Sequence, residues 1–253
     1  TNSSFVYHDP IAVEQASSED TARYKAAKFA KGNILDLSGG MGIDSWFFSN
    51  FCERVTHVEI NEALHKITAM NFKNAGKENV SFVCSSADDF VQQTNERFNL
   101  VYLDPSRRIH DKKVYRIEDC EPDAITLLPE LMKISDAVLI KTSPMLDIRK
   151  TVSTLHFVDE VHVVSVKNEC KEVLYLLSKK QVLEPLHVAV ELKKPNFSVK
   201  FLPSEENKAS ATIGQDGSYL YEPNVAVLKA GMFKLPTLRY PLQKISPNSH
   251  LYV

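Results

Sequence analysis

The pattern of apolar residues along the chain alternates between short buried runs and amphipathic segments. Apolar runs of strand length occupy residues 33–37, 54–60, 80–84, 98–103 and 137–141. Between and after them, apolar residues at a spacing of three to four predict helices over residues 44–51, 61–76, 123–135 and 145–155. Strands that alternate with helices predict an α/β fold with a parallel sheet, because each crossover returns the chain to the same edge.

The alternation changes after residue 157. Residues 158–166 and 172–178 both have strand character, and only residues 167–171 separate them. Five residues are too few for a crossover helix, so these two strands are predicted to be antiparallel. The expected fold is therefore a Rossmann-like sheet of seven strands, parallel with an antiparallel terminal hairpin.

The composition of the chain changes again near residue 181. Residues 186–192 and 197–202 alternate like strands, residues 205–217 form a polar loop, and residues 225–233 have the pattern of a short helix. These elements predict a small α+β appendage over residues 181–253. The main domain is expected at residues 32–180. The chain begins at Thr1 and ends in an apolar, strand-like segment, so we expect a piece trimmed at both ends.

A helical entry segment is expected at residues 1–31, ahead of the first strand. Its helix runs from about residue 19 to residue 31, and Ala22 and Ala26 lie on its apolar face. We expect this face to pack on the sheet. Lys25 and Lys28 are then expected to point toward solvent or toward the mouth of a ligand site.

Composition excludes several classes of protein. The chain has 253 residues, a formal net charge of -2 and no apolar run approaching the roughly 18 residues of a transmembrane helix. Its four cysteines form no C-x-x-C pair, and its eight histidines are scattered. A zinc site, another metal centre and a disulfide framework are therefore disfavoured. A soluble protein of the reducing cytoplasm is predicted, and any nucleic-acid contact must come from a local basic patch.

Candidate chemistry begins at the glycine-rich turn between the first strand and the first sheet helix. Gly39, Gly40 and Gly42 follow Asp36 there, and glycine allows both positive φ angles and close approach of a ligand. Glu59 ends the second strand about 20 residues later, the distance expected for a carboxylate that binds ribose hydroxyls. A cofactor that contains a nucleoside is therefore predicted.

The carboxylate of Asp36 bears on the kind of cofactor. It would repel a pyrophosphate, so a ligand with an amine or a sulfonium is favoured. With Glu59 and the segment Asp104-Pro105-Ser106, the motif Asp36-x-x-Gly39-Gly40-x-Gly42 resembles the class I S-adenosylmethionine-dependent methyltransferases. The resemblance implies S-adenosyl-L-methionine as cofactor. The implied contacts are the methionine end for Asp36, Ser38, Gly39, Gly40, Gly42 and Asp44, the ribose for Glu59, and the adenine for Ile60, Ala87 and Asp88.

Other segments are similar to the bacterial methyltransferases that carry a THUMP-like C-terminal domain. They are the entry segment at residues 17–26, the turn and strand at residues 168–172, and the tail at residues 219–224 and 230–231. THUMP domains bind RNA, so this resemblance implies an RNA substrate, either tRNA or rRNA.

A basic segment follows the fourth strand. Five positive residues stand there against Asp111 alone, an excess of 5 − 1 = 4, and they are Arg107, Arg108, Lys112, Lys113 and Arg116. Because the segment continues a motif at the carboxyl edge of the sheet, contacts with RNA phosphates are predicted. In a purely structural role, Arg107 and Arg108 would instead pair with Asp88, Asp89 or Glu118.

Two methyl acceptors remain open. Relatives that methylate amines have Asp/Asn-Pro-Pro and an aromatic residue, and here Ser106 and Arg107 take the last two places. Asp-Pro still favours an exocyclic base amine, with Asp104, Pro105, Ser106 and Lys141 as catalytic residues. Ribose 2'-O-methyltransferases imply instead a set of Lys25, Asp104, Lys141 and Glu172. Carbon-5 pyrimidine methylation requires a cysteine nucleophile at the end of a sheet strand, and neither residues 104–108 nor residues 141–144 contain one.

Two other functions compete with methyl transfer. Gly40-x-Gly42 followed by Glu59 is also compatible with an NAD-binding oxidoreductase. A non-catalytic RNA-binding protein that retains a methyltransferase fold is the third hypothesis.

Overall fold

The computed structural model describes residues 16–106, 108–109, 112–113, 116–180, 182–214 and 217–253. The chain forms two compact units. The first contains residues Thr1–Thr142 and Leu176–Lys179, and the second contains Ser143–Tyr175 and Lys180–Val253. The domain boundaries expected from the sequence, at 31/32 and 180/181, remain predictions.

The first unit is built on parallel strands in the order β7-β4-β1-β2-β3. Their bounds are β1 (Asn33–Asp36), β2 (Arg54–Glu59), β3 (Val80–Cys84), β4 (Phe98–Leu103) and β7 (Ser135–Thr142). Ile34 and Leu35 of β1 and Val101 of β4 are fully buried, as expected for central strands covered on both faces. The register sets Asp36, the last residue of β1, opposite His57 on one side and Tyr102 on the other.

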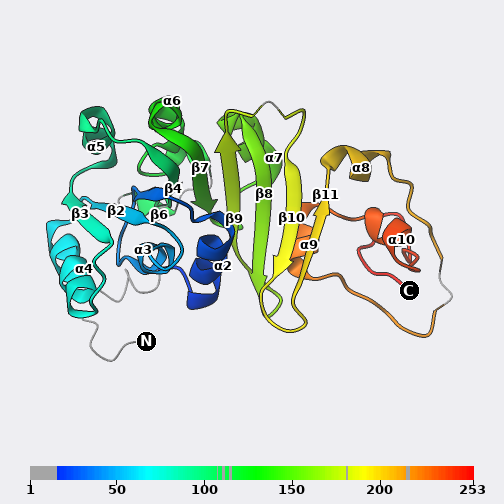
Figure 1. The fold of residues 1–253 in the computed structure, drawn as a ribbon. Coiled ribbons are helices and arrows are strands. Elements are labelled where there is room, and N and C mark those ends of the chain that lie inside the picture. The colour runs from blue at the N-terminus through cyan, green and yellow to red at the C-terminus, as the bar shows by residue number, and fades with distance from the viewer. Residues whose placement is uncertain (1–15, 107, 110–111, 114–115, 181, 215–216) are drawn as a thin grey trace. The chain divides into compact units, whose positions relative to one another are not determined.

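Helices cover both faces of this sheet (Figure 1). The helices α2 (Glu19–Phe29), α3 (Ile43–Phe48) and α4 (Glu62–Asn74) lie on one face, and α5 (Ala87–Gln93) and α6 (Ala124–Ile134) lie on the other. Side-chain caps fix where four of them begin, because Ser18, Asn61, Ser86 and Asp123 each accept a hydrogen bond from an amide of the first turn. A short 3-10 helix, η1 (Ile117–Asp119), precedes α6.

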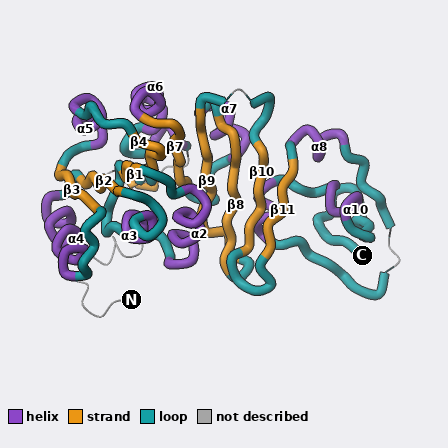
Figure 2. The backbone as a smooth tube through the Cα atoms, viewed as in Figure 1, coloured by secondary structure: helices purple, strands orange, loops and turns teal. Residues whose placement is uncertain are grey.

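The second unit contains a mixed set of strands in the order β11-β10-β8-β9, which Figure 2 shows in orange. They are β8 (Val158–Val166), β9 (Glu169–Ser178), β10 (Leu186–Glu191) and β11 (Phe197–Phe201), and the last three residues of β9 belong to the first unit. Lys167 and Asn168 both have positive φ, 53° and 59°, and form the two-residue turn of an antiparallel hairpin. β10 runs parallel to β8, and β11 runs antiparallel to β10.

The predicted sheet is confirmed as mostly parallel with an antiparallel hairpin, and its details differ from expectation. The seven expected strands correspond to β1 to β4 and β7 to β9, and β10 and β11 continue from β8. β9 begins at Glu169 rather than at residue 172, because a two-residue turn suffices where Asn168 adopts a positive φ. Part of the expected polar loop at 205–217 is the helix α8 (Pro203–Lys208).

The rest of the second unit is helical or irregular. Its other helices are α7 (Ile148–Leu155), α9 (Val225–Ala230) and α10 (Leu235–Arg239), and α10 was not predicted. Among the described residues no helix combines the length and the apolar character needed to cross a bilayer.

A buried carboxylate connects several parts of the second unit. Glu191, the last residue of β10, is 4% exposed. Burial alone would raise its pKa, but hydrogen bonds outweigh that effect and lower the pKa to about 2. The donors lie within 2.9 to 3.0 Å and come from the main chain of Lys167, Asn168 and Lys193 and from the side chains of Ser165 and Asn224.

Candidate functional site

The glycine turn follows β1 and leads into α3. Gly40 and Gly42 have φ angles of 53° and 74°, which favour glycine. Gly39 has a different reason for lacking a side chain, because a Cβ there would lie 2.1 Å from Cε1 of His57. The amide of Gly39 donates to the carbonyl of Val58 at 2.9 Å, so the turn is held against β2.

Glu59 meets the glycine turn at the end of β2. One carboxylate oxygen accepts from the Gly40 amide at 2.9 Å, and the other accepts from the Asn61 amide at 2.7 Å. The carbonyl of Glu59 accepts from the Ser85 amide at 3.2 Å, which brings the end of β3 beside it. The proximity of Glu59 and the turn is thus observed.

The residues assigned to adenine lie on the segments that follow β2 and β3. Ile60 is 71% exposed directly after Glu59. Ala87 is buried and Asp88 is exposed in the first turn of α5. Their role in binding adenine stays a prediction.

Asp36 is buried beneath the turn at 1% exposure. Its Oδ2 accepts from the Ser45 hydroxyl at 2.6 Å, and the same hydroxyl lies 3.0 Å from Nδ1 of His57. Burial raises the pKa of Asp36 to about 7. The Ser45 hydroxyl and the main chain of Ser38 work against that shift, and the carboxylates of Asp44 and Asp104 reinforce it. This carboxyl group therefore titrates near neutral pH.

Asp44 joins the entry helix to α3. Its carboxylate lies 3.1 Å from Nζ of Lys25 and accepts from the hydroxyls of Ser17 at 2.7 Å and Tyr102 at 2.9 Å. Burial alone would raise the pKa of Asp44, but Lys25, Lys141 and these hydrogen bonds outweigh burial and lower it. The expectation that Lys25 points toward solvent or the site mouth is wrong, because its side chain is fully buried against Asp44.

Asp104 follows β4 and meets the end of β7. Its amide donates to the Ser38 hydroxyl at 2.6 Å, which ties the strand end to the glycine turn. Its carboxylate forms an ion pair with Lys141. Pro105 is buried, and Ser106 is exposed, with its main chain bonded to that of Glu121 in both directions. Asp104 and Lys141 thus meet because β4 and β7 are neighbours in the sheet.

The remaining predicted residues are described only in part. Arg107 lies outside the described residues, and Arg108, Lys112 and Lys113 are described by their backbone, as the short strands β5 (Arg108–Ile109) and β6 (Lys112–Lys113). Arg116 is exposed ahead of η1. Glu172 is buried at 2% exposure on β9, in the second unit. The assignments of these residues to RNA or to catalysis stay predictions.

Three contributors to the site were missed from the sequence. Ser45 bonds to Asp36, Tyr102 bonds to Asp44, and His57 bonds to the Ser45 hydroxyl, so the three residues come from three different elements. A signal was present for His57, which is a polar residue in the middle of a strand buried on both faces. Among the described residues no group of three or more metal-ligating side chains occurs that could hold an ion.

The chain is similar to a solved structure called "putative methyltransferase" from Porphyromonas gingivalis W83, with 32% sequence identity and a TM-score of 0.87. The similarity covers 97% of this chain and 63% of the Porphyromonas chain. This chain therefore spans less than two thirds of the length of that relative.

Two more distant structures share the fold. A precorrin-6y C5,15-methyltransferase from Geobacter metallireducens GS-15 has 13% identity and a TM-score of 0.54, with 71% of this chain and 96% of that chain covered. A "putative RNA methyltransferase" from Pyrococcus horikoshii has 14% identity and a TM-score of 0.50, with 70% and 93% covered. The chain has a methyltransferase fold.

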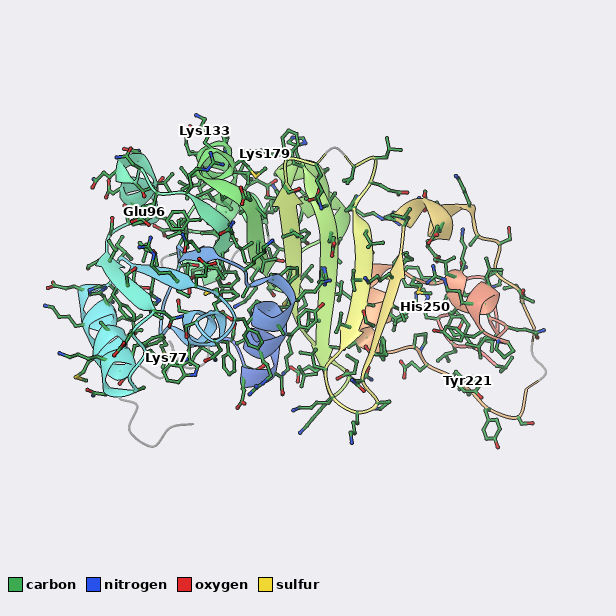
Figure 3. All side chains as sticks on the ribbon, in the orientation of Figure 1. Lys77, Glu96, Lys133, Lys179, Tyr221 and His250 are labelled. Carbon is green, nitrogen blue, oxygen red and sulfur yellow. The ribbon has the colours of Figure 1, made fainter. Side chains whose placement is uncertain are left out.

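The C-terminal part has a match of its own. A family model described as a ferredoxin-like domain matches residues 219–253. Within them the main chains of Tyr221 and Tyr252 bond to each other, and the rings of Phe233 and His250 stack at 4.4 Å; Figure 3 labels Tyr221 and His250. A search of curated proteins by sequence found no match.

Proposed function

We propose that this protein is an S-adenosylmethionine-dependent methyltransferase that modifies RNA at an exocyclic amine of a base. The observation that carries the proposal is the arrangement at the carboxyl ends of four strands of the first unit. The glycine turn and Glu59 stand at the ends of β1 and β2, and the Asp104–Lys141 pair stands at the ends of β4 and β7. Ligands of open α/β sheets bind at this edge.

The charges of the site suit a cationic ligand. Asp44 and Asp104 each repel the negative charge of Asp36, and the ammonium groups of Lys25 and Lys141 pair with Asp44 and Asp104. When Asp36 is ionised, three carboxylates face two ammonium groups, which leaves one carboxylate in excess, 3 − 2 = 1. In addition, Oδ1 of Asp36 is buried and meets no hydrogen-bond partner in the described part of the chain. These features support a ligand that brings positive charge to the glycine turn.

In this proposal the chain's own residues hold the cofactor by its two ends. Residues 36–44 line the methionine end, Glu59 accepts hydrogen bonds from the ribose hydroxyls, and Ile60, Ala87 and Asp88 lie along the adenine. When bound, S-adenosylmethionine supplies a methyl group activated by its sulfonium. The task left to the protein is to place a nucleophile in line with that methyl group.

Asp104 is the group that would orient the nucleophile. The Ser38 hydroxyl holds its main chain at the turn, and Lys141 holds one carboxylate oxygen, Oδ2. The second oxygen can accept a hydrogen of a base amine and direct the nitrogen lone pair toward the methyl group. Asp104 therefore acts by orientation and by accepting a hydrogen bond.

One observation favours a second acceptor, the ribose 2'-hydroxyl. Asp104 and Lys141, two of the four residues implied for hydroxyl methylation, are in contact. A hydroxyl is a weak nucleophile at neutral pH and needs a base, and a lysine amine can serve as one. In that alternative Lys141 removes the proton, and the carboxylate of Asp104 fixes the geometry.

The direct test is transfer of a labelled methyl group from S-adenosylmethionine to fractionated cellular RNA, followed by identification of the modified nucleoside. A base methylated on nitrogen is expected. A 2'-O-methylated ribose would support the second acceptor. Binding of NAD rather than S-adenosylhomocysteine in a calorimetric titration would support an oxidoreductase, and RNA binding without transfer would support a non-catalytic protein.

Glu59→Ala is expected to weaken binding of S-adenosylmethionine by roughly 1.5 to 3 kcal/mol, because the ribose hydroxyls lose a charged acceptor. Calorimetric titration measures the effect. Since Glu59 also accepts from the amides of Gly40 and Asn61, a melting curve of the variant must accompany the titration. Glu96→Gln, at an exposed acid after α5, is the control. Unchanged affinity in a folded Glu59→Ala variant would remove Glu59 from the site.

Replacing Arg107 and Arg108 together by alanine is expected to weaken RNA binding and to flatten its salt dependence by nearly one unit of slope per lost phosphate contact. The affinity for S-adenosylmethionine should hardly change. The measurement is a set of RNA titrations over a range of salt concentrations. A double variant with the wild-type slope would contradict the role of these arginines.

A further inference from the structure

Three buried side chains form a hydrogen-bonded chain beneath the glycine turn. Asp36 ends β1, Ser45 lies in α3, His57 lies in the middle of β2, and all three are at most 1% exposed. The Ser45 hydroxyl is 2.6 Å from Oδ2 of Asp36 and 3.0 Å from Nδ1 of His57. The imidazole also fills the space beside Gly39, where a Cβ would lie 2.4 Å from both ring nitrogens.

The single hydrogen of the Ser45 hydroxyl links the protonation of Asp36 to the tautomer of His57. If Asp36 is ionised, Ser45 donates to Asp36 and must accept from Nδ1–H of His57, which leaves Nε2 bare. If Asp36 is protonated on Oδ2, it donates to Ser45, Ser45 donates to Nδ1, and the imidazole hydrogen is on Nε2. Either arrangement keeps both hydrogen bonds of the Ser45 hydroxyl. An ionised Asp36 with the imidazole hydrogen on Nε2, or a protonated Asp36 with it on Nδ1, would lose one of them.

The unpartnered atoms point to the same two states. Oδ1 of Asp36 and Nε2 of His57 are buried, and neither has a hydrogen-bond partner among the residues that the structure describes. A proton on the carboxyl group is therefore stabilised on Oδ2, where it can be donated to Ser45, rather than on Oδ1. The proton of Asp36 and the hydrogen of His57 are coupled through one hydroxyl group.

The surrounding charges place this equilibrium in an accessible pH range. Burial, Asp44 and Asp104 raise the pKa of Asp36, and against the Ser45 hydrogen bond the pKa reaches about 7. Burial and the neighbouring His65 lower the pKa of His57 to about 3, so its ring stays neutral. The ammonium groups of Lys25 and Lys141 are paired with Asp44 and Asp104.

We propose that Asp36, Ser45 and His57 form a proton-linked switch, in which a cation bound at the glycine turn expels one proton from Asp36 and moves the imidazole hydrogen of His57 from Nε2 to Nδ1. The proton count balances, because the Asp36 proton goes to solvent while Ser45 and His57 keep their number of hydrogens. The identity of the cation rests on the proposed function. Ser45 and His57 act as positioning residues, since both lie behind the turn.

The tautomer is tested first, without any ligand, by nitrogen-15 NMR of the histidine rings. In the wild-type protein the bare nitrogen of His57 is expected to change from Nδ1 to Nε2 between about pH 5.5 and about pH 8.5, as Asp36 loses its proton. In Ser45→Ala and Asp36→Asn the tautomer should be independent of pH. A wild-type His57 with one tautomer throughout, or a switch that persists in Asp36→Asn, overturns the proposal.

The coupling to the cofactor is tested by calorimetry in buffers of different ionisation enthalpy. Below about pH 7 the dissociation constant of the wild-type protein for S-adenosylmethionine is expected to fall about tenfold for each unit by which the pH rises, because binding releases one proton. The variant Asp36→Asn should release no proton on binding. S-adenosylhomocysteine, which lacks the sulfonium charge, should release less. Equal release with both ligands, or none with either, overturns the coupling. Failure to bind S-adenosylmethionine at any pH refutes the proposed function. The NMR test uses no ligand, so its result does not depend on the proposed function.

Discussion

Asp104→Ala is expected to lower the rate of methyl transfer to RNA by about 10²- to 10⁴-fold, the range of a positioned group that accepts a proton or hydrogen bond. The change removes the acceptor at the end of β4 and leaves the Lys141 ammonium without its carboxylate. Ser38 still binds the main-chain amide of residue 104, so the turn should keep its place. The measurement is single-turnover transfer of a labelled methyl group, with cofactor affinity determined in parallel.

Lys141→Met is the companion variant that distinguishes the two acceptors. If the acceptor is a base amine, Asp104 still orients it, and the rate should fall by less than about tenfold. If the acceptor is a ribose hydroxyl that needs Lys141 as its base, the loss should approach that of Asp104→Ala. A wild-type rate for Asp104→Ala would show that Asp104 does not act on the nucleophile in either case.

Lys25→Met is expected to lower the free energy of unfolding by about 3 to 5 kcal/mol, because it removes the ammonium group in direct contact with a buried carboxylate and leaves only the weaker influence of Lys141. Lys25 is fully buried, and its Nζ lies 3.1 Å from Asp44 and 2.9 Å from the Ser17 hydroxyl. Urea unfolding at neutral pH measures the effect. Lys28→Met, at an exposed lysine on the same helix, is the matched control and should change little.

The effect of Lys25→Met should depend on pH. The pKa of Asp44 is held below its ordinary value of 3.8, so Asp44 contributes stability above about pH 4, and that contribution is lost as the pH falls. The difference between wild type and variant should therefore shrink in acid. Adding Asp44→Asn to Lys25→Met should cost little, because the unpaired charge is then gone. If Lys25→Met lost as much stability at low pH as at neutral pH, the ion pair with Asp44 could not be the cause of the loss.

The central strands of the first unit could be predicted from the sequence because burial on both faces leaves a continuous apolar run, and the edge strand β3 still contains a short apolar run, Val80, Phe82 and Val83. The predicted runs at residues 80–84 and 98–103 coincide with β3 and β4. The helix α5 was missed, because in its seven residues only Ala87 and Val91 are buried, too few for a helical period to be visible. Helix α10 has only five residues and begins with Leu-Pro, so it gives no periodic signal either.

The meeting of the candidate site residues could be predicted as far as it depends on the ends of strands. The glycine turn, Glu59, Asp104 and Lys141 follow from the rule that parallel strands deliver their last residues to one edge. The contacts of Asp44 with Lys25 and Tyr102 could not be predicted, because they depend on the rotation of α2 against α3 and on the register of β4. The sequence contains the lysine, but nothing in its spacing shows that it is buried.

The buried carboxylate of Glu191 has a consequence for how this chain can be divided or recombined. It serves donors from the β8–β9 turn, from the segment after β10 and from the start of α9. A cut near residue 181 would leave amides of Lys167 and Asn168 on one piece and their acceptor on the other. The region after residue 181 is therefore a poor candidate for a transferable module, and chimaeras between relatives should exchange it together with the β8–β9 hairpin.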